Sequence, residues 1–172
     1  MVRRKEAQVA ALLIVAVVIV LRLLAVPSTE VGLYVGAPWW HRLTYQFFHA
    51  GWIHLAVNCW ALLCIVFLYE IDLKMLLGAL AAAASFPCGL LAPLYSTPML
   101  TTIGLSGMCY ALLGRYSFGV KRKLYYQLWW AFFIGIGFFF PSVNAILHLY
   151  CYLCGLLLAL LNKPFTYEER GC

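Results

Sequence analysis

Charged side chains are scarce in this chain. Asp, Glu, Lys and Arg make up only 10% of its 172 residues, whereas soluble globular domains carry about 25%. Apolar residues supply 65% of the chain, and the mean hydropathy is +0.91. Such a composition excludes an ordinary water-soluble protein, and it leaves no polar segment long enough for a soluble domain. We therefore expect an integral membrane protein organised as one domain over residues 1–172.

The apolar stretches are separated by short connections, and six of them can be read as transmembrane helices. The predicted spans cover residues 7–26, 52–69, 73–91, 104–116, 125–140 and 145–161. The fourth is unusually short, and Pro93 and Pro98 interrupt the segment before it. Because unpaired backbone cannot face lipid, we expect that segment to enter a protein-lined cavity and the fourth helix to begin below the membrane surface. The predicted fold class is an all-α polytopic membrane protein with a six-helix bundle.

Cations are distributed unevenly over the predicted loops. Ten of the 12 Lys and Arg residues fall on one side of the six-span arrangement, and only Arg42 lies in a loop on the other side. The positive-inside rule then places both termini in the cytoplasm. This topology explains the net charge of +6, so that no nucleic-acid partner is expected.

The basic N-terminus ahead of an apolar run also fits a cleaved signal peptide, which would leave five spans. The run is longer than the usual apolar region of a signal peptide, and this favours a retained first span.

Polar side chains in the predicted spans converge on one depth. The second, fourth and sixth spans run from outside to inside in this topology. His49, His54 and Asn58 lie at the start of the second span, Ser106 at the start of the fourth, and His148 at the start of the sixth. Because such groups are costly in hydrocarbon, their gathering in the outer part of the membrane indicates a functional site.

Ser106 and His148 have the chemistry of a nucleophile and a general base. A serine at a helix start lies beside free backbone N–H groups, and His54 with Asn58, one helical turn apart, could donate to an oxyanion. No Asp or Glu lies inside a predicted span. The pattern therefore predicts a Ser–His dyad and not a triad with a carboxylate.

Small residues recur along one side of the fourth and sixth spans. They are Gly107, Ala111 and Gly114 in the fourth span and Cys151, Gly155 and Ala159 in the sixth. Because small side chains let membrane helices approach closely, we expect these two spans to pack together beneath Ser106 and His148.

Three motifs on successive spans resemble those of the rhomboid family of intramembrane serine proteases. Gly104-Leu105-Ser106-Gly107 resembles the family's Gly-x-Ser-Gly motif, and the run from His49 through His54 to Asn58 resembles its second-helix motif. His148 followed by Gly155 is similar to the sixth-helix histidine and its close-packing glycine. The resemblance covers nearly the whole chain and matches the minimal six-helix layout of bacterial members.

This resemblance implies an intramembrane serine endopeptidase in which Ser106 is the nucleophile and His148 is the base and then the acid. It also implies roles for other residues: an oxyanion hole from His54, Asn58 and the backbone N–H groups of Ser106 and Leu105; support from Tyr110, His49, Gly104, Gly107 and Gly155; and a gate at Trp130. Implied substrates are transmembrane segments of other proteins, cut without a cofactor at a site that opens to the outer side of a bacterial inner membrane.

Two other functions remain open from the sequence. One is a catalytically inactive rhomboid-like protein that binds transmembrane helices, although such relatives usually lack the serine or the histidine. The other is a small transporter, although the chain lacks repeat symmetry and intramembrane acids. The four histidines and Cys151-x-x-Cys154 are weak metal or redox signals in an apolar setting, so we expect no metal site. The seven cysteines indicate no disulfide framework, and the oligomeric state and the role of Cys172 stay open.

Overall fold

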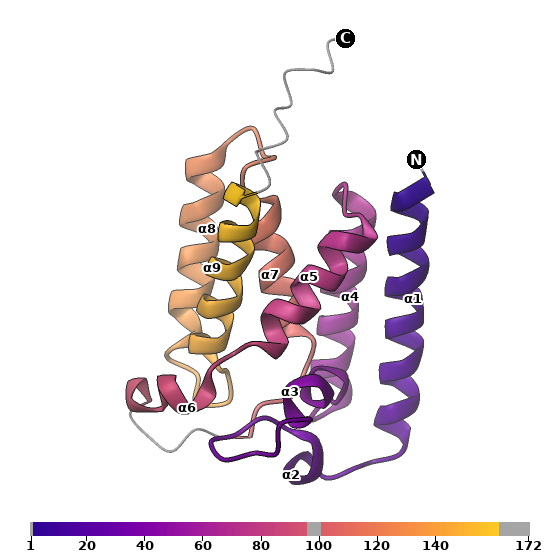
Figure 1. The fold of residues 1–172 in the computed structure, drawn as a ribbon, viewed down its shortest axis with the longest axis vertical. Coiled ribbons are helices and arrows are strands. Elements are labelled where there is room, and N and C mark those ends of the chain that lie inside the picture. The colour runs from indigo at the N-terminus through magenta and orange to yellow at the C-terminus, as the bar shows by residue number, and fades with distance from the viewer. Residues whose placement is uncertain (1, 96–100, 162–172) are drawn as a thin grey trace.

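The computed structural model describes residues 2–95 and 101–161, which are almost entirely helical (Figure 1). Strand-type pairing in these residues is limited to one isolated bridge, between Leu33 and Thr102. The all-α part of the prediction is confirmed for the described residues. The inferences about Pro98 and Cys172 concern residues outside these ranges.

Each predicted span overlaps one of the longer helices. These are α1 (Val2–Leu23), α4 (Trp52–Leu68), α5 (Leu73–Ala84), α7 (Ser106–Tyr116), α8 (Lys123–Gly137) and α9 (Ala145–Leu161). Short elements connect them: α2 (Ser28–Val31), α3 (His41–Thr44), η1 (Tyr45–Phe47), α6 (Cys88–Leu91) and η2 (Ala92–Leu94).

Length and hydropathy alone identify fewer membrane spans than the six predicted. Within the described residues, Arg4–Leu23 is the one helix that is long and apolar enough to cross a membrane. Two bent pairs would raise the number to three if each were a single span: His41–Phe47 with Trp52–Leu68, and Leu73–Ala84 with Cys88–Leu94. The number of spans therefore stays a prediction.

The third predicted span, 73–91, is wrong as one continuous helix. α5 ends at Ala84, and the helical turns that follow from Cys88 are bent by 55° from it. Pro87 lies at the break, where its ring cannot continue a helix. The first helix also begins and ends earlier than the predicted span, because α1 runs from Val2 to Leu23 and Ala25 has a φ of 51°.

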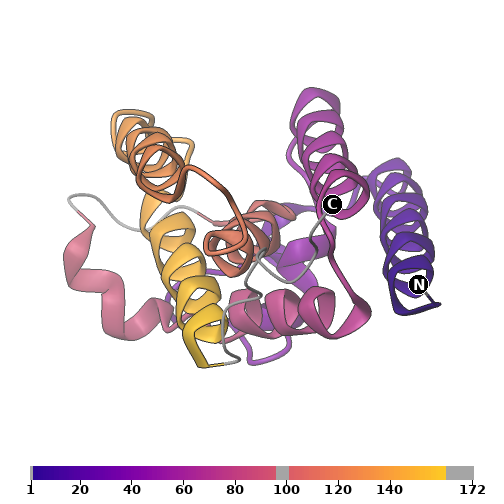
Figure 2. The ribbon, with the colours of Figure 1, turned by 90° about the horizontal axis from the view of Figure 1, so that it is seen from above.

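α7 lies at the centre of the bundle when the molecule is viewed along its long axis (Figure 2). It packs against α9, α5 and α4, whereas α1 lies at the edge against α4. Most of α7 is buried, but in α8 only Ile134 and Gly137 are. The bundle is therefore built around the short helix that begins at Ser106.

Two glycines bring the backbones of α7 and α9 into direct contact. A Cβ atom on Gly114 would lie 2.1 Å from the carbonyl oxygen of Tyr152, and one on Gly155 would lie 2.0 Å from that of Ala111. Since real Cβ atoms do not approach backbone oxygen so closely, neither position accepts a larger residue without separating the helices. The predicted close approach of the fourth and sixth spans is confirmed at these glycines.

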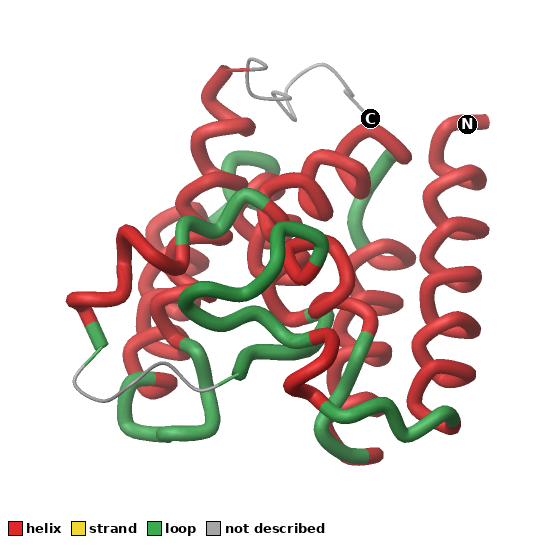
Figure 3. Tube along the Cα trace, turned by 60° about the horizontal axis from the view of Figure 1, so that its bottom comes forward, coloured by secondary structure: helices red, strands yellow, loops and turns green. Residues whose placement is uncertain are grey.

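The long connection between α1 and α4 lies across one end of the bundle (Figure 3), where Leu33 pairs with Thr102 of the segment before α7. Side chains in it bond to backbone carbonyl groups at the end of α5 and just beyond it: Tyr45 Oη donates to Ala83 O over 2.9 Å, and the Arg42 guanidinium donates to Phe86 O over 2.8 Å. These bonds satisfy carbonyl groups that the break after α5 frees from helical pairing.

We expect Gly155→Ala to destabilise the protein, because the added methyl group must push α9 away from α7. Overpacking of this kind costs about 1–3 kcal/mol. The matched control is Gly135→Ala on α8, where an added Cβ meets nothing within 4 Å. The thermal unfolding midpoint in detergent should fall for Gly155→Ala and hold or rise for Gly135→Ala; equal midpoints would contradict the close contact.

Candidate active site

Ser106 and His148 lie together although 42 residues separate them in the sequence. Ser106 is the first residue of α7, and His148 lies one turn into α9. His148 Nε2 and Ser106 Oγ are 2.8 Å apart, which is hydrogen-bonding distance. Both side chains are half-buried. A neutral imidazole in this position can accept the hydroxyl proton of the serine.

An aromatic ring stacks on the imidazole of His148. Tyr110, one turn along α7 from Ser106, stacks on it with ring centroids 4.3 Å apart and planes inclined by 20°. Trp130 of α8 contacts Tyr110 in a T-shaped arrangement, with ring centroids 5.9 Å apart. The residue predicted as a gate therefore contacts the residue that supports His148.

A glycine in a left-handed conformation forms the turn before Ser106. Gly104 has a φ of 121°, and its N–H donates to Tyr45 O over 2.9 Å. A Cβ atom here would lie 2.9 Å from Nε2 of His54. Only glycine fits this turn, both for its backbone angle and for the imidazole that lies against it.

His49 contacts the same turn from the connection ahead of α4. Its buried imidazole accepts the N–H of Leu105 at Nε2 over 3.5 Å, and it meets His54 edge-on with ring centroids 5.1 Å apart. Burial, and then the neighbouring His54, lower the pKa of His49 to about 4. His49 is therefore neutral near pH 7 and keeps the lone pair that receives the N–H of Leu105.

Asn58 is buried on α4, one turn from His54. Its Nδ2 donates to the carbonyl oxygen of His54 over 2.8 Å, and its Oδ1 has no partner among the described residues. The Cys109 thiol lies 4.0 Å from the Asn58 carbonyl oxygen, which places this turn of α4 beside the start of α7. An amide nitrogen has two N–H groups, so one remains available to a ligand.

The structure adds three residues that the sequence did not indicate. Asn144, Thr102 and Tyr95 form a hydrogen-bonded group at the N-terminal end of α9. The one signal available beforehand was an asparagine directly before a predicted helix, which is a common N-cap. Nothing in the spacing connects it to the other two.

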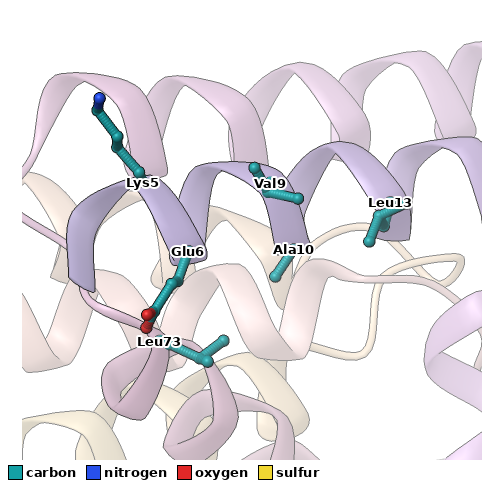
Figure 4. A pocket seen from close by; sticks show the side chains of 6 residues that line it. All are labelled: Lys5, Glu6, Val9, Ala10, Leu13 and Leu73. Atoms are coloured by element: carbon teal, nitrogen blue, oxygen red, sulfur yellow. The ribbon is translucent and has the colours of Figure 1, made fainter. Parts of the chain in front are cut away.

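A separate groove of about 420 Å³ lies between α1 and the start of α5 (Figure 4). Its lining is Lys5, Glu6, Val9, Ala10, Leu13 and Leu73. Neither Ser106 nor His148 contributes to it, so it is distinct from the candidate active site.

The fold and the site define a class: an all-helical membrane protein in which a serine at a helix start bonds to a histidine of a neighbouring helix. A family model, the Rhomboid domain, matches residues 36–164. The match covers most of the chain, and the chain therefore belongs to the rhomboid family. Most members of this family are serine proteases that act within the membrane, and some relatives are inactive. Among curated proteins, none matches the chain.

We expect Gly104→Ala to destabilise the protein more than Gly36→Ala does. Both glycines have positive φ, at 121° and 87°, so each alanine meets backbone strain of about 1–3 kcal/mol. Only at position 104 does the added methyl group also press on His54, since Gly36 has nothing within 4 Å. Thermal unfolding in detergent measures the difference, and an equal loss in both variants would show that His54 does not lie against this turn.

Proposed function

We propose that this protein is an intramembrane serine endopeptidase that uses Ser106 and His148 as a catalytic dyad. The observation that carries the proposal is the 2.8 Å contact between His148 Nε2 and Ser106 Oγ. Membership of the rhomboid family supports it. The proposed substrates are membrane proteins cleaved in or near a transmembrane segment.

In the proposed reaction, His148 Nε2 takes the proton of Ser106 as Oγ attacks the carbonyl carbon of the scissile peptide bond. The tetrahedral intermediate collapses when the protonated His148 gives that proton to the leaving amine, and an acyl-enzyme ester remains on Ser106. A water molecule, deprotonated by His148, then hydrolyses the ester. Tyr110 supports the reaction by fixing the plane of the imidazole.

The proposed oxyanion hole lies at the N-terminus of α7. The backbone N–H of Ser106 belongs to a helix start, where it has no helical acceptor and the helix dipole favours negative charge. The free N–H of Asn58 and the imidazole of His54 are side-chain donors from α4. Leu105, the other predicted backbone donor, directs its N–H to His49, so it would join the hole only by leaving that bond.

The second candidate is an inactive relative that binds transmembrane helices. The hydrogen bond between Ser106 and His148 favours the protease, because a binding protein has no need to hold a hydroxyl against an imidazole. We propose the same cellular setting as the sequence predicts: a bacterial inner membrane, with the site open to its outer side.

A serine-directed fluorophosphonate should label the wild-type protein in detergent. Ser106→Ala should abolish labelling because it removes the attacking oxygen, and His148→Ala should reduce it at least a hundredfold because it removes the base. Gel fluorescence measures the extent of labelling.

The matched control is Ser117→Ala, which removes the buried serine at the other end of α7 and should label as the wild type does. The protease proposal fails if the folded wild type stays unlabelled or if Ser106→Ala labels equally.

Asn58→Ala should slow the cleavage of a transmembrane peptide in liposomes without abolishing it. One lost oxyanion donor raises the barrier by about 3 kcal/mol, roughly a hundredfold in kcat, and the other donors remain. Cys59→Ala, at the adjacent buried position, is the control and should keep its kcat. Unchanged turnover in Asn58→Ala would remove Asn58 from the hole.

A further inference from the structure

Asn144 connects the segment before Ser106 to the start of α9. Its Nδ2 donates to Oγ1 of Thr102 over 2.8 Å. Its Oδ1 accepts the N–H of Leu147 over 2.9 Å and the hydroxyl of Tyr95 over 2.7 Å. All three lengths are typical of hydrogen bonds. Asn144 therefore caps α9 and also joins it to Thr102 and Tyr95.

The backbone donor on Oδ1 determines which way the amide faces. The N–H of Leu147 needs an acceptor, and an amide nitrogen cannot accept it. The nitrogen must therefore point to Thr102. The bond between Asn144 and Thr102 is then directional, with no equivalent flipped arrangement.

Each residue of this bond lies four positions before a proposed catalytic residue. Thr102 precedes Ser106 by four residues, and the Gly104 turn comes between them. Asn144 precedes His148 by four residues, and the N–H of His148 donates to the carbonyl of Asn144 over 3.1 Å. One side-chain bond thus joins the chain just before the nucleophile to the helical turn that carries the base.

No other contact described above fixes this end of α9 to that segment. The glycine contacts between α7 and α9 lie below the site: Gly155 is seven residues beyond His148, about 10 Å along the helix at 1.5 Å per residue. Thr102 is paired by its backbone to Leu33, which belongs to the connection between α1 and α4 and not to α9. Other bonds reach this turn of α9, from Ser106 to His148 and from Ser85 to Tyr150, but neither involves the segment before Ser106.

We propose that Asn144 is a positioning residue that sets the distance between Ser106 Oγ and His148 Nε2 through its bond to Thr102. This inference rests on the proposed function. Together with the glycine contacts, this bond fixes the start of α9 relative to the chain just before α7, and so limits the distance between the two catalytic groups. Loss of the bond leaves both catalytic groups in place but allows their separation to vary, so the chemical step slows while substrate binding does not.

Asn144→Ser and Thr102→Val separate positioning from helix capping. A serine at position 144 still caps α9 but is too short to replace the bond to Thr102. Valine at position 102 has the shape of threonine without the hydroxyl and keeps the backbone pairing to Leu33. Each variant should lower kcat for a transmembrane peptide in liposomes by about tenfold with little change in KM. The double variant should be no slower than either single variant, because both remove one bond.

Thr102→Ser restores the hydroxyl and should recover most of the rate lost in Thr102→Val. Ser85→Ala is the matched control: it deletes a hydroxyl that also bonds to α9, at Tyr150 Oη over 2.9 Å, outside the proposed site, and it should leave kcat unchanged.

The inference is overturned if Asn144→Ser and Thr102→Val keep their kcat, if their effects multiply in the double variant, or if the loss appears only in KM. Labelling of the wild type separates this result from a failure of the proposed function. A labelled wild type with unaffected variants overturns the positioning role alone, and a wild type that is never labelled overturns both.

Discussion

The contact between the backbones of α7 and α9 is the constraint on which the site depends. Lipid tails are as apolar as the side chains of the helices, so helices in a membrane associate through close packing and hydrogen bonds. Gly114 and Gly155 allow that packing at carbonyl contact, and larger residues there would force the helices apart. Ser106 and His148 extend from the same two helices, so their 2.8 Å separation requires the close approach of the helices below them.

The helices place the base, but the loops place the nucleophile. The irregular segment before α7 has backbone groups that cannot be left unpaired in an apolar setting. The connection between α1 and α4 supplies their partners: Leu33 pairs with Thr102, Tyr45 accepts from Gly104, and His49 accepts from Leu105. The long connection between α1 and α4 therefore has a structural role: it pairs the backbone of the segment before Ser106.

The parts of this structure that depend on composition could be predicted from the sequence, and those that depend on the path of the loops could not. Lipid demands long apolar helices, so the last helix was predicted at its observed bounds, 145–161. The break at Pro87 was missed because apolar residues continue on both sides of it. Ser106 and His148 could be paired in advance because such groups are costly in hydrocarbon. The bond from Asn144 to Thr102 joins two polar residues in loops, where they carry no such signal.

Under the proposed mechanism, the absence of a carboxylate beside His148 in the described part of the chain has an energetic explanation. A buried carboxylate orients a histidine but costs several kcal/mol to desolvate in an apolar bundle. The ring of Tyr110 orients the imidazole with no charge at all. The cost of this arrangement is that no carboxylate among residues 2–95 and 101–161 pairs with the protonated imidazole, so the dyad must depend on geometry set before the reaction begins. Contacts that hold α7, α9 and Tyr110 in place therefore contribute to the rate in the way that the third residue of a triad does elsewhere.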